Sequence, residues 1–218
     1  MLVKDYMTKH PIMIAPEALA SKAQHIMIEN KIRHLPVVTD GKRLVGLVTR
    51  NRLSVPPSDL PSLNVWEISR ILSKLRVKDV MVKQADLITI TQDSVVEDAA
   101  AIMVENKVGC LPVVDSDGIV IGIISEVDLL AELSVLLGGG VPGIRVTIRV
   151  PDQVGEFAKV TTAIASRGWG IYSSGGVPAP KAPGYWDMVV KVRNVSADEI
   201  AAVLSQIEGQ EIRDIRVI

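Results

Sequence analysis

Aromatic residues and cysteine are both scarce in this sequence. Its 218 residues include one phenylalanine, three tyrosines, three tryptophans and a single cysteine, Cys110. One cysteine forms no disulfide within the chain and supplies no multi-thiolate zinc site. Few aromatic rings and a formal net charge of −1 argue against a stacking platform or an electrostatic surface for nucleic acid. We therefore expect no nucleic-acid partner.

Long apolar runs are also missing. The sequence has no run of eighteen apolar residues, and its first residues lack the apolar segment of a signal peptide. We therefore expect a cytoplasmic protein without a membrane partner. With 48% hydrophobic residues, the chain has enough apolar material to bury a core.

Motifs of catalysis are absent from the sequence as well. It contains no nucleophile–base–acid set, no Walker loop and no cluster with metal-ligand spacing. The three histidines, His10, His25 and His34, show no ligand spacing among themselves. We therefore expect no catalytic residues, no metal and no catalytic cofactor, and the chain is not predicted to be an enzyme.

What the sequence does contain is an internal repeat of roughly fifty residues. Residues 3–9 return as residues 77–83, and residues 27–31 return as residues 103–107. The apolar spacing predicts, in each unit, a short helix, a strand, a helix, two strands and a helix. Units this small bury little surface alone, so we expect the two copies to pack together.

Each repeat contains a predicted β-hairpin that leads into a helix. In the second repeat, residues 109–124 form the hairpin, and Ser125-Glu-Val-Asp128 starts a helix over residues 127–137. In the first repeat, residues 35–48 form the hairpin and Thr49-Arg-Asn-Arg52 follows. Ser-x-x-Asp before an apolar helix is a capping pattern that needs no ligand. The carboxylate of Asp128 can also accept hydrogen bonds from ribose hydroxyls, so both roles stay open.

The repeat, the Leu-Pro-Val-Val strands and the Ser-x-x-Asp helix start resemble a tandem pair of CBS domains over residues 3–133. The resemblance implies a module with two-fold pseudosymmetry that binds an adenine nucleotide, with AMP, ADP or ATP as the expected ligand. It implies that Asp128 holds the ribose and that Ser125 and the helix N-terminus hold a phosphate. The other residues implicated in this site are Thr8, His10, Pro11, Ile12, Ile32, Arg33 and Gly109.

The first repeat departs from this pattern. Thr49 keeps the hydroxyl, but Arg52 cannot accept a hydrogen bond from a ribose hydroxyl. A cation in the first turn also opposes the helix dipole, so Arg52 is either solvated or in contact with an anion. We expect one competent nucleotide site and a second site, at Thr49 and Arg52, that is empty or altered.

Proline and glycine clusters divide the chain into segments. A linker over residues 55–76, with an amphipathic helix over residues 63–75, separates the repeats. A glycine-rich linker then precedes a third domain. The expected segments are 1–54 for the first repeat, 55–76 for the linker, 77–137 for the second repeat, 138–143 for the glycine-rich linker and 144–218 for the third domain.

The third domain has the predicted order βαββαβ, which is ferredoxin-like, so the whole chain is predicted to be α+β. Its predicted elements are strand 144–150, helix 156–167, strand 170–174, strand 185–193, a helix capped by Ser196 and Glu199, and strand 211–217. With a turn from Asp152 to Gly155, this domain resembles an ACT domain, which implies dimerisation or binding of a small ligand at that turn. From this spacing alone an ordinary tight turn is the favoured interpretation of Gly155, and dimerisation is the better supported expectation for the domain.

Together the segments resemble the acetoin-utilisation accessory proteins of bacteria. That resemblance implies a regulatory protein, a homodimer, whose partner is a regulated enzyme. Two other functions stay open at this point. One is a structural partner-binding scaffold with a vestigial nucleotide site, and the other is an enzyme acting in acetoin breakdown.

Overall fold

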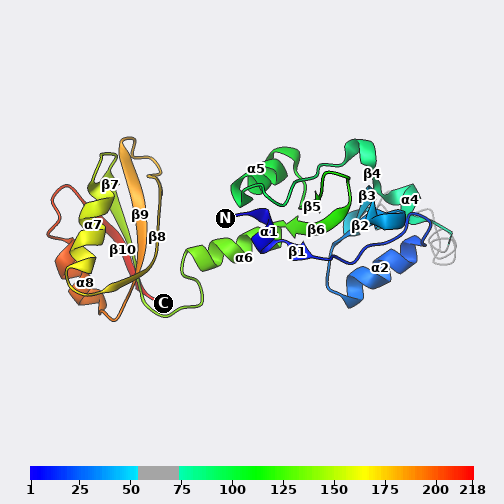
Figure 1. The fold of residues 1–218 in the computed structure, drawn as a ribbon. Coiled ribbons are helices and arrows are strands. Elements are labelled where there is room, and N and C mark those ends of the chain that lie inside the picture. Colours follow the sequence, from blue (N-terminus) through cyan, green and yellow to red (C-terminus); the bar gives the residue numbers. More distant parts are fainter. Residues whose placement is uncertain (54–73) are drawn as a thin grey trace, which may run out of the picture. The chain divides into compact units, whose positions relative to one another are not determined.

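The computed structural model describes residues 1–53 and 74–218. Its contacts divide the chain into two compact units, residues 1–129 and 130–218. The linker helix predicted over residues 63–75, including Trp66, lies outside the described residues apart from its last two positions. Figure 1 labels the elements of both units.

The first unit contains both repeats, and their elements follow the predicted order. In the first repeat, the described residues after β3 form a 3-10 turn, Arg50–Leu53, where the sequence predicted the start of a helix. The first-repeat elements are α1 (Val3–Tyr6), β1 (Thr8–Lys9), α2 (Ala20–Glu29), β2 (His34–Val38) and β3 (Leu44–Thr49). The second-repeat elements are α4 (Val77–Val80), β4 (Val82–Lys83), α5 (Val96–Asn106), β5 (Cys110–Val114), β6 (Val120–Ser125) and α6 (Glu126–Leu136).

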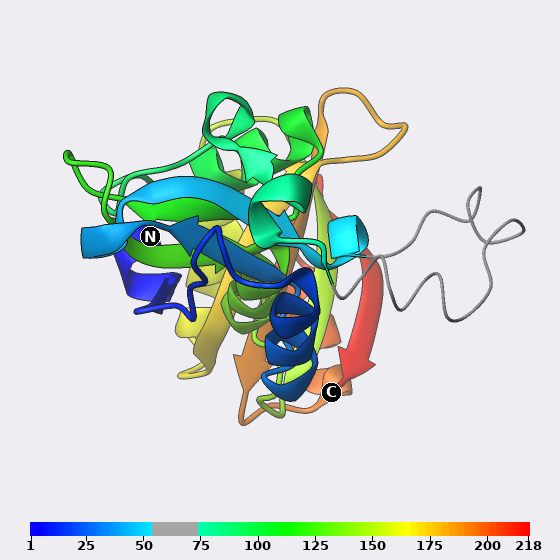
Figure 2. The same cartoon turned by 90° about the vertical axis from the view of Figure 1, so that its right-hand side faces the viewer.

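The two repeats exchange their first strands. One sheet has the order β1-β6-β5 and the other the order β2-β3-β4, so each hairpin is completed by a short strand from the other repeat. Thr8 of β1 pairs with Ile123 of β6, and Val82 of β4 pairs with Leu47 of β3. In both views of the structure, α2 and α5 lie on opposite sides of these sheets (Figures 1 and 2). Neither repeat therefore forms its sheet without the other.

Each repeat has its own apolar core, built from equivalent positions. Ala23 and Met27 of α2 are buried in the first repeat, as Ala99 and Met103 of α5 are in the second. The apolar spacing of the sequence predicts Leu19 and Val95 on these same faces, and this prediction is wrong. Both residues precede their helices as N-caps in extended conformation, and they are 41% and 37% exposed. The buried faces begin one residue later.

The second unit contains a four-stranded antiparallel sheet with two helices. The strand order β10-β7-β9-β8 matches the ferredoxin-like order expected from the sequence. The sequence predicted that the strand ends at residue 174, but strand β8 runs to Pro178. Its last residues have weak strand propensity, and their pairing with β9 extends the strand. The elements are β7 (Ile144–Pro151), α7 (Glu156–Ala165), β8 (Gly170–Pro178), β9 (Tyr185–Arg193), α8 (Ala197–Leu204) and β10 (Glu211–Val217).

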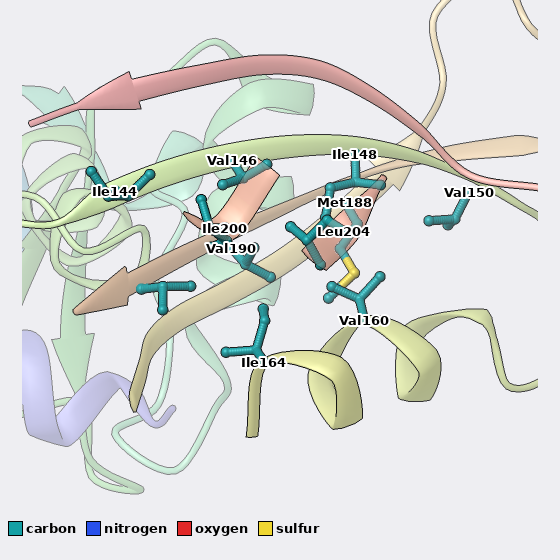
Figure 3. Packing of buried hydrophobic residues seen from close by; sticks show 11 residues of the cluster. Ile144, Val146, Ile148, Val150, Val160, Ile164, Met188, Val190, Ile200 and Leu204 are labelled. Atoms are coloured by element: carbon teal, nitrogen blue, oxygen red, sulfur yellow. The ribbon is translucent and has the colours of Figure 1, made fainter. Parts of the chain in front are cut away.

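One face of this sheet forms the core with the helices. Alternate residues of β7, from Ile144 to Val150, point toward α7 and α8, where Val160, Ile164 and Ile200 are fully buried (Figure 3). The other face is polar. There Arg149 of β7 donates two hydrogen bonds to the carboxylate of Asp187 on β9, at 2.8 and 2.9 Å.

The glycine-rich linker is fixed to this polar face. Lys191 of β9 is only 2% exposed, and its Nζ donates a 2.8 Å hydrogen bond to the carbonyl oxygen of Gly138. Gly138 has a φ of +76°, which lets its amide bond to the carbonyl of Val135 and end the preceding helix. At the other end of the linker, the backbones of Gly143 and Ile218 exchange two hydrogen bonds. Both ends of the linker are thus attached to the second unit.

Candidate ligand-binding clefts

The two hairpins end in the same local geometry. His34 pairs with Thr49 in the first repeat, as Cys110 pairs with Ser125 in the second. The amide of Arg50 donates to the carbonyl of Arg33 at 2.9 Å, and the equivalent bond joins Glu126 to Gly109 at 3.1 Å. This pseudosymmetry makes Thr49 the counterpart of Ser125 and Arg52 the counterpart of Asp128.

In the second repeat, Ser125 and Asp128 form a side-chain cap at the start of α6. The amide and the hydroxyl of Ser125 both donate to Oδ2 of Asp128, at 2.8 and 2.7 Å. These bonds satisfy an amide that the helix leaves without a partner. The capping role that the pattern predicted is therefore present. Both bonds end on one carboxylate oxygen, which leaves the geometry compatible with a further acceptor role for Oδ1.

Four of the other residues implicated in the Asp128 site lie on or just after the exchanged strand β1. Thr8 pairs with Ile123, two residues before Ser125 on the neighbouring strand. Pro11 is buried, while Ile12 is 41% exposed. His10 has a φ of +51° and lines a separate cleft of about 370 Å³. Ile32 packs against the first-repeat core.

A cleft of about 470 Å³ lies between the repeats and is lined by residues of both. This volume is within the range of small-molecule sites. The cleft brings together Thr49 and Arg52 with Arg33 and Gly109, which the sequence had assigned to two different sites. The other residues implicated in nucleotide binding, which do not line this cleft, are Thr8, His10, Pro11, Ile12, Ile32, Ser125 and Asp128. The described cleft therefore lies at the first-repeat position.

Charged side chains dominate the polar part of this cleft. It is lined by four cations, which are Arg33, Arg50, Arg52 and Lys107, and by two carboxylates, which are Asp86 and Glu126. Sequence reasoning missed Arg50, Lys107, Asp86 and Glu126. The repeat points to Arg50 and Glu126, which follow Thr49 and Ser125, and to Lys107, which repeats Lys31. No sequence signal points to Asp86.

His34 and Cys110 occupy equivalent positions at the middle of this cleft. Burial lowers the pKa of His34, and Arg33 lowers it further, while Glu126 opposes the shift. Burial raises the pKa of the Cys110 thiol to about 12, and the carboxylates of Glu126 and Asp128 act in the same direction. His34 is thus held neutral near pH 7, and Cys110 is held as the thiol, which is a poor nucleophile.

Gly109 lies where the two repeats approach each other. A Cβ atom at this position would lie 3.3 Å from Oε2 of Glu126 and 3.5 Å from the ring of His34. Such a contact is tighter than ordinary packing with Glu126, so a larger residue would displace that side chain. Gly109 keeps this part of the cleft open.

The turn from Asp152 to Gly155 precedes α7 in the second unit. Gly155 has a φ of +93° and is the N-cap of the helix, a conformation that favours glycine without a ligand. Asp152 lines a small pocket of about 220 Å³ beside Phe157 and Trp186, and Gly155 does not line it. Glu156 in the same pocket accepts hydrogen bonds from Gln210 and Lys159, which lower its pKa. Its charge is therefore already compensated within the chain.

Two further features bear on the class of site. Within residues 1–53 and 74–218, no group of three or more histidine, cysteine, aspartate or glutamate side chains is placed to hold a metal ion. In the same residues, no helix combines the length and the apolar character needed to cross a membrane.

Comparison with known proteins identifies the family of the first unit. The sequence model of the CBS domain matches residues 3–54 and 77–135, which make up more than half of the chain. The chain belongs to the CBS domain family. Its two repeats, which exchange their first strands, are the two domains of a CBS pair.

Solved structures resemble the same part of the chain. The CBS domain pair of protein MJ0100, in complex with 5′-methylthioadenosine and S-adenosyl-L-methionine, is 27% identical, with a TM-score of 0.51 over 62% of this chain and 96% of that chain. The AcuB protein of Vibrio cholerae is 29% identical, with a TM-score of 0.53 over 63% of this chain and 93% of that chain.

Two curated relatives match this chain over part of their own length. A homoserine O-acetyltransferase of Methanococcus vannielii is 30% identical over 62% of this chain, but the match covers 25% of that enzyme. The uncharacterized protein MJ1225 of Methanocaldococcus jannaschii is 34% identical over 59% of this chain and 46% of its own length. The match thus spans a quarter to a half of these relatives.

Proposed function

We propose that this chain is a regulatory, non-catalytic protein that senses an adenine nucleotide, AMP, ADP or ATP, between its two CBS repeats. The observation that carries the proposal is the strand exchange, which places β1 of the first repeat beside β6, the strand that leads into Ser125 and Asp128. A ligand that contacts both repeats stabilises the packing to which it binds more tightly, and this is the physical basis of sensing. The MJ0100 pair, solved with two adenosine compounds, supports the ligand class.

Within this proposal, the nucleoside is held at the second repeat. Asp128 accepts hydrogen bonds from the ribose hydroxyls, and Ser125 and the N-terminus of α6 receive a phosphate. The side chains on β1 and before β2 enclose the base. Arg33 and Gly109, which the sequence assigned to the same site, line the cleft at the first-repeat position instead. The proposed base-side residues are Thr8, His10, Pro11, Ile12 and Ile32.

The second unit extends the proposal to assembly. Its ferredoxin-like sheet supports an ACT-like domain that dimerises the chain, with the turn at Asp152 and Gly155 as a secondary ligand position. A regulated enzyme is the proposed partner and the cytoplasm the proposed location. The likeness to AcuB, a protein named for acetoin utilization, supports a link to that pathway.

A partner-binding scaffold is the second candidate function. One observation favours it: Oδ2 of Asp128 already accepts two hydrogen bonds from Ser125, so Asp128 has a structural role without any ligand. In that case the CBS pair would present a surface to a partner, and adenosine compounds would leave its stability unchanged.

Thermal melting of the full chain with AMP, ADP, ATP and S-adenosylmethionine separates the two functions. A ligand present at a hundred times its dissociation constant adds about 2.7 kcal/mol of stability to the state that binds it. We expect this stabilisation in the wild type and its loss in Asp128→Ala. Each variant is compared with its own ligand-free melting temperature, because removing a cap costs about 1 kcal/mol by itself.

The chain supplies a matched control for that experiment. Ser196 and Glu199 form an equivalent capping box in the second unit, with the Ser196 amide and hydroxyl both donating to Oε2 of Glu199. Glu199→Ala therefore removes a cap without touching the CBS pair. If no adenosine compound stabilises the wild type, or if Asp128→Ala retains the full stabilisation, the sensing proposal is wrong and the scaffold is favoured.

A further inference from the structure

Lys191 of β9 is a buried cation without a carboxylate partner. Its side chain is only 2% exposed, and no salt bridge within residues 1–53 and 74–218 includes it. Its cross-strand neighbour on β7 is Arg145, which carries the same charge on the same face of the sheet. Burying an unpaired charge is costly, and like charges opposite each other on a sheet are destabilising. Lys191 therefore costs stability unless another group compensates for its ammonium charge.

The C-terminal end of α6 supplies that group. Nζ of Lys191 donates a 2.8 Å hydrogen bond to the carbonyl oxygen of Gly138, just after the helix. Carbonyl groups at a helix C-terminus carry partial negative charge, so a cation is stabilised there. The contact is also close, because a Cβ atom on Gly138 would lie 2.8 Å from Cδ of Lys191, 2.8 Å from Oγ of Ser173 and 3.2 Å from the ring of Tyr172. The end of α6 is therefore fixed to β8 and β9.

The two ends of α6 belong to different units. Its first turn, with the cap formed by Ser125 and Asp128, lies in the first unit, and the helix passes into the second unit at Leu130. None of its eleven residues is buried, whereas α2, α5, α7 and α8 each bury two or more residues. The side-chain cap at one end and Lys191 at the other are therefore the main fixed points of this helix.

We propose that α6 transmits the state of its N-terminal cap to the second unit, and that Lys191 is the positioning residue that attaches the end of α6 to the sheet. For its ligand this proposal rests on the proposed function, in which a nucleotide held by Asp128 stabilises the start of α6. Helix formation is cooperative, so a stabilised start also favours the attached end. Through Gly138 that preference reaches β8 and β9. Without the bond from Lys191, the glycine-rich segment leaves the end of α6 free of the sheet, and the transmission stops there.

Hydrogen exchange of the full chain, followed by mass spectrometry, tests this transmission without any ligand. The readouts are the amides of Leu137, Gly138 and Gly139, which donate to carbonyls of α6, and the β8 amides that pair with β9. Asp128→Ala removes the cap and should speed exchange of these amides about fivefold, the effect expected for one helix cap. Lys191→Met keeps a long side chain but loses the donor, and should speed exchange of the amides after α6 about tenfold.

The two changes together form a double-mutant cycle. In the Lys191→Met background the end of α6 is already released, so Asp128→Ala should have a further effect of less than about twofold on the same amides. Gly138→Ala disturbs the same contact from the helix side and should repeat the effect of Lys191→Met. The amides of β7 report whether each variant is folded, and if Lys191→Met loosens β7, Gly138→Ala takes its place in the cycle.

Lys181→Met is the matched control. It removes the same charge from an exposed position between β8 and β9, and the amides after α6 should exchange in this variant as they do in the wild type. The transmission is refuted if Asp128→Ala leaves these amides unchanged, or if it speeds their exchange equally in the wild type and in Lys191→Met. It is also refuted if Lys181→Met has the effect of Lys191→Met.

The same measurement with 5′-methylthioadenosine keeps this proposal distinct from the proposed function. The bound compound should slow exchange of the amides after α6 in the wild type and leave them unchanged in Lys191→Met. Binding without this slowing in the wild type refutes the transmission. If the chain binds no adenosine compound but the cycle shows coupling between Asp128 and Lys191, the proposed function is wrong and the transmission stands.

Discussion

Replacing Gly46 by alanine tests the exchange of strands between the repeats. Gly46 of β3 pairs with Lys83 of β4, and a Cβ atom there would lie 2.9 Å from the carbonyl oxygen of Val82 and would overlap the Met81 side chain. Gly122 of β6 is the equivalent residue in the second repeat. The three atoms nearest to its Cβ atom would all belong to the Met7 side chain.

These contacts predict unequal costs for two chemically identical changes. Overpacking a buried site costs about 1–3 kcal/mol, and alanine recovers about 0.5–1 kcal/mol through its smaller loss of backbone entropy. A methionine side chain rotates away at little cost, whereas the backbone carbonyl of a paired strand cannot. We therefore expect Gly46→Ala to destabilise the first unit by about 1–2 kcal/mol. Gly122→Ala should cost about 0.5 kcal/mol or less.

Hydrogen exchange of the amides in β3 and β6, followed by mass spectrometry, measures these costs within the first unit. Tryptophan fluorescence is less suited, since two of the three tryptophans, Trp169 and Trp186, lie in the second unit. Truncating Met7 to alanine should abolish the cost of Gly122→Ala, while truncating Met81 should relieve only part of the cost of Gly46→Ala. If Gly46→Ala costs no more than Gly122→Ala, β4 does not lie against β3 as described.

Three further predictions concern single side chains. Arg149 lowers the pKa of Asp187, so the second unit should lose stability as the pH falls below about 4. Asp187→Asn should make this loss of stability with pH smaller, as measured by the fluorescence of Trp169 and Trp186 during acid unfolding. Burial raises the pKa of Cys110 to about 12, so its thiol should resist iodoacetamide at pH 8 in the native protein and react once guanidinium unfolds the chain. Rapid alkylation of the native protein would contradict the burial of Cys110. Ile200→Ala, at a fully buried position between α8 and the sheet, should cost about 2–5 kcal/mol in urea unfolding of the second unit, and a cost below 1 kcal/mol would contradict the described core.

The order of the elements could be predicted from the sequence because the pattern repeats. Two copies of a hairpin, each with Asp-Gly in its turn, predicted the strands of the first unit. The alternation of apolar and polar residues over 144–150 predicted β7. The end of β8 could not be predicted in this way. Its glycines and Pro178 have weak strand propensity, and only the pairing with β9 extends the strand.

The candidate site was harder to predict than the fold. The asymmetry between Asp128 and Arg52 is visible in the sequence, but the residues that surround Arg52 are not local to it. Lys107 follows a helix in the other repeat, and Asp86 follows the exchanged strand β4. Only strand exchange brings them to one cleft with Arg52, and hydrophobic patterning carries no information about that exchange.

The role of Lys191 could not be foreseen either. Strand alternation placed it on the polar face of the sheet, where an exposed lysine is the ordinary expectation. The structure buries it, because its ammonium group reaches the carbonyl of Gly138 at the end of a helix. The glycine-rich segment after that helix, expected as a linker, is thereby attached to the sheet.

The most direct test of this account is the stoichiometry of an uncharged adenosine compound. Calorimetric titration of the full chain with 5′-methylthioadenosine should give one equivalent per chain, because the second repeat has Asp128 at the position that Arg52 occupies in the first repeat. The same titration of Asp128→Ala should give none, while Glu199→Ala should bind as the wild type does. Two equivalents per chain, or unchanged binding in Asp128→Ala, would contradict the assignment of a single nucleoside site to the second repeat.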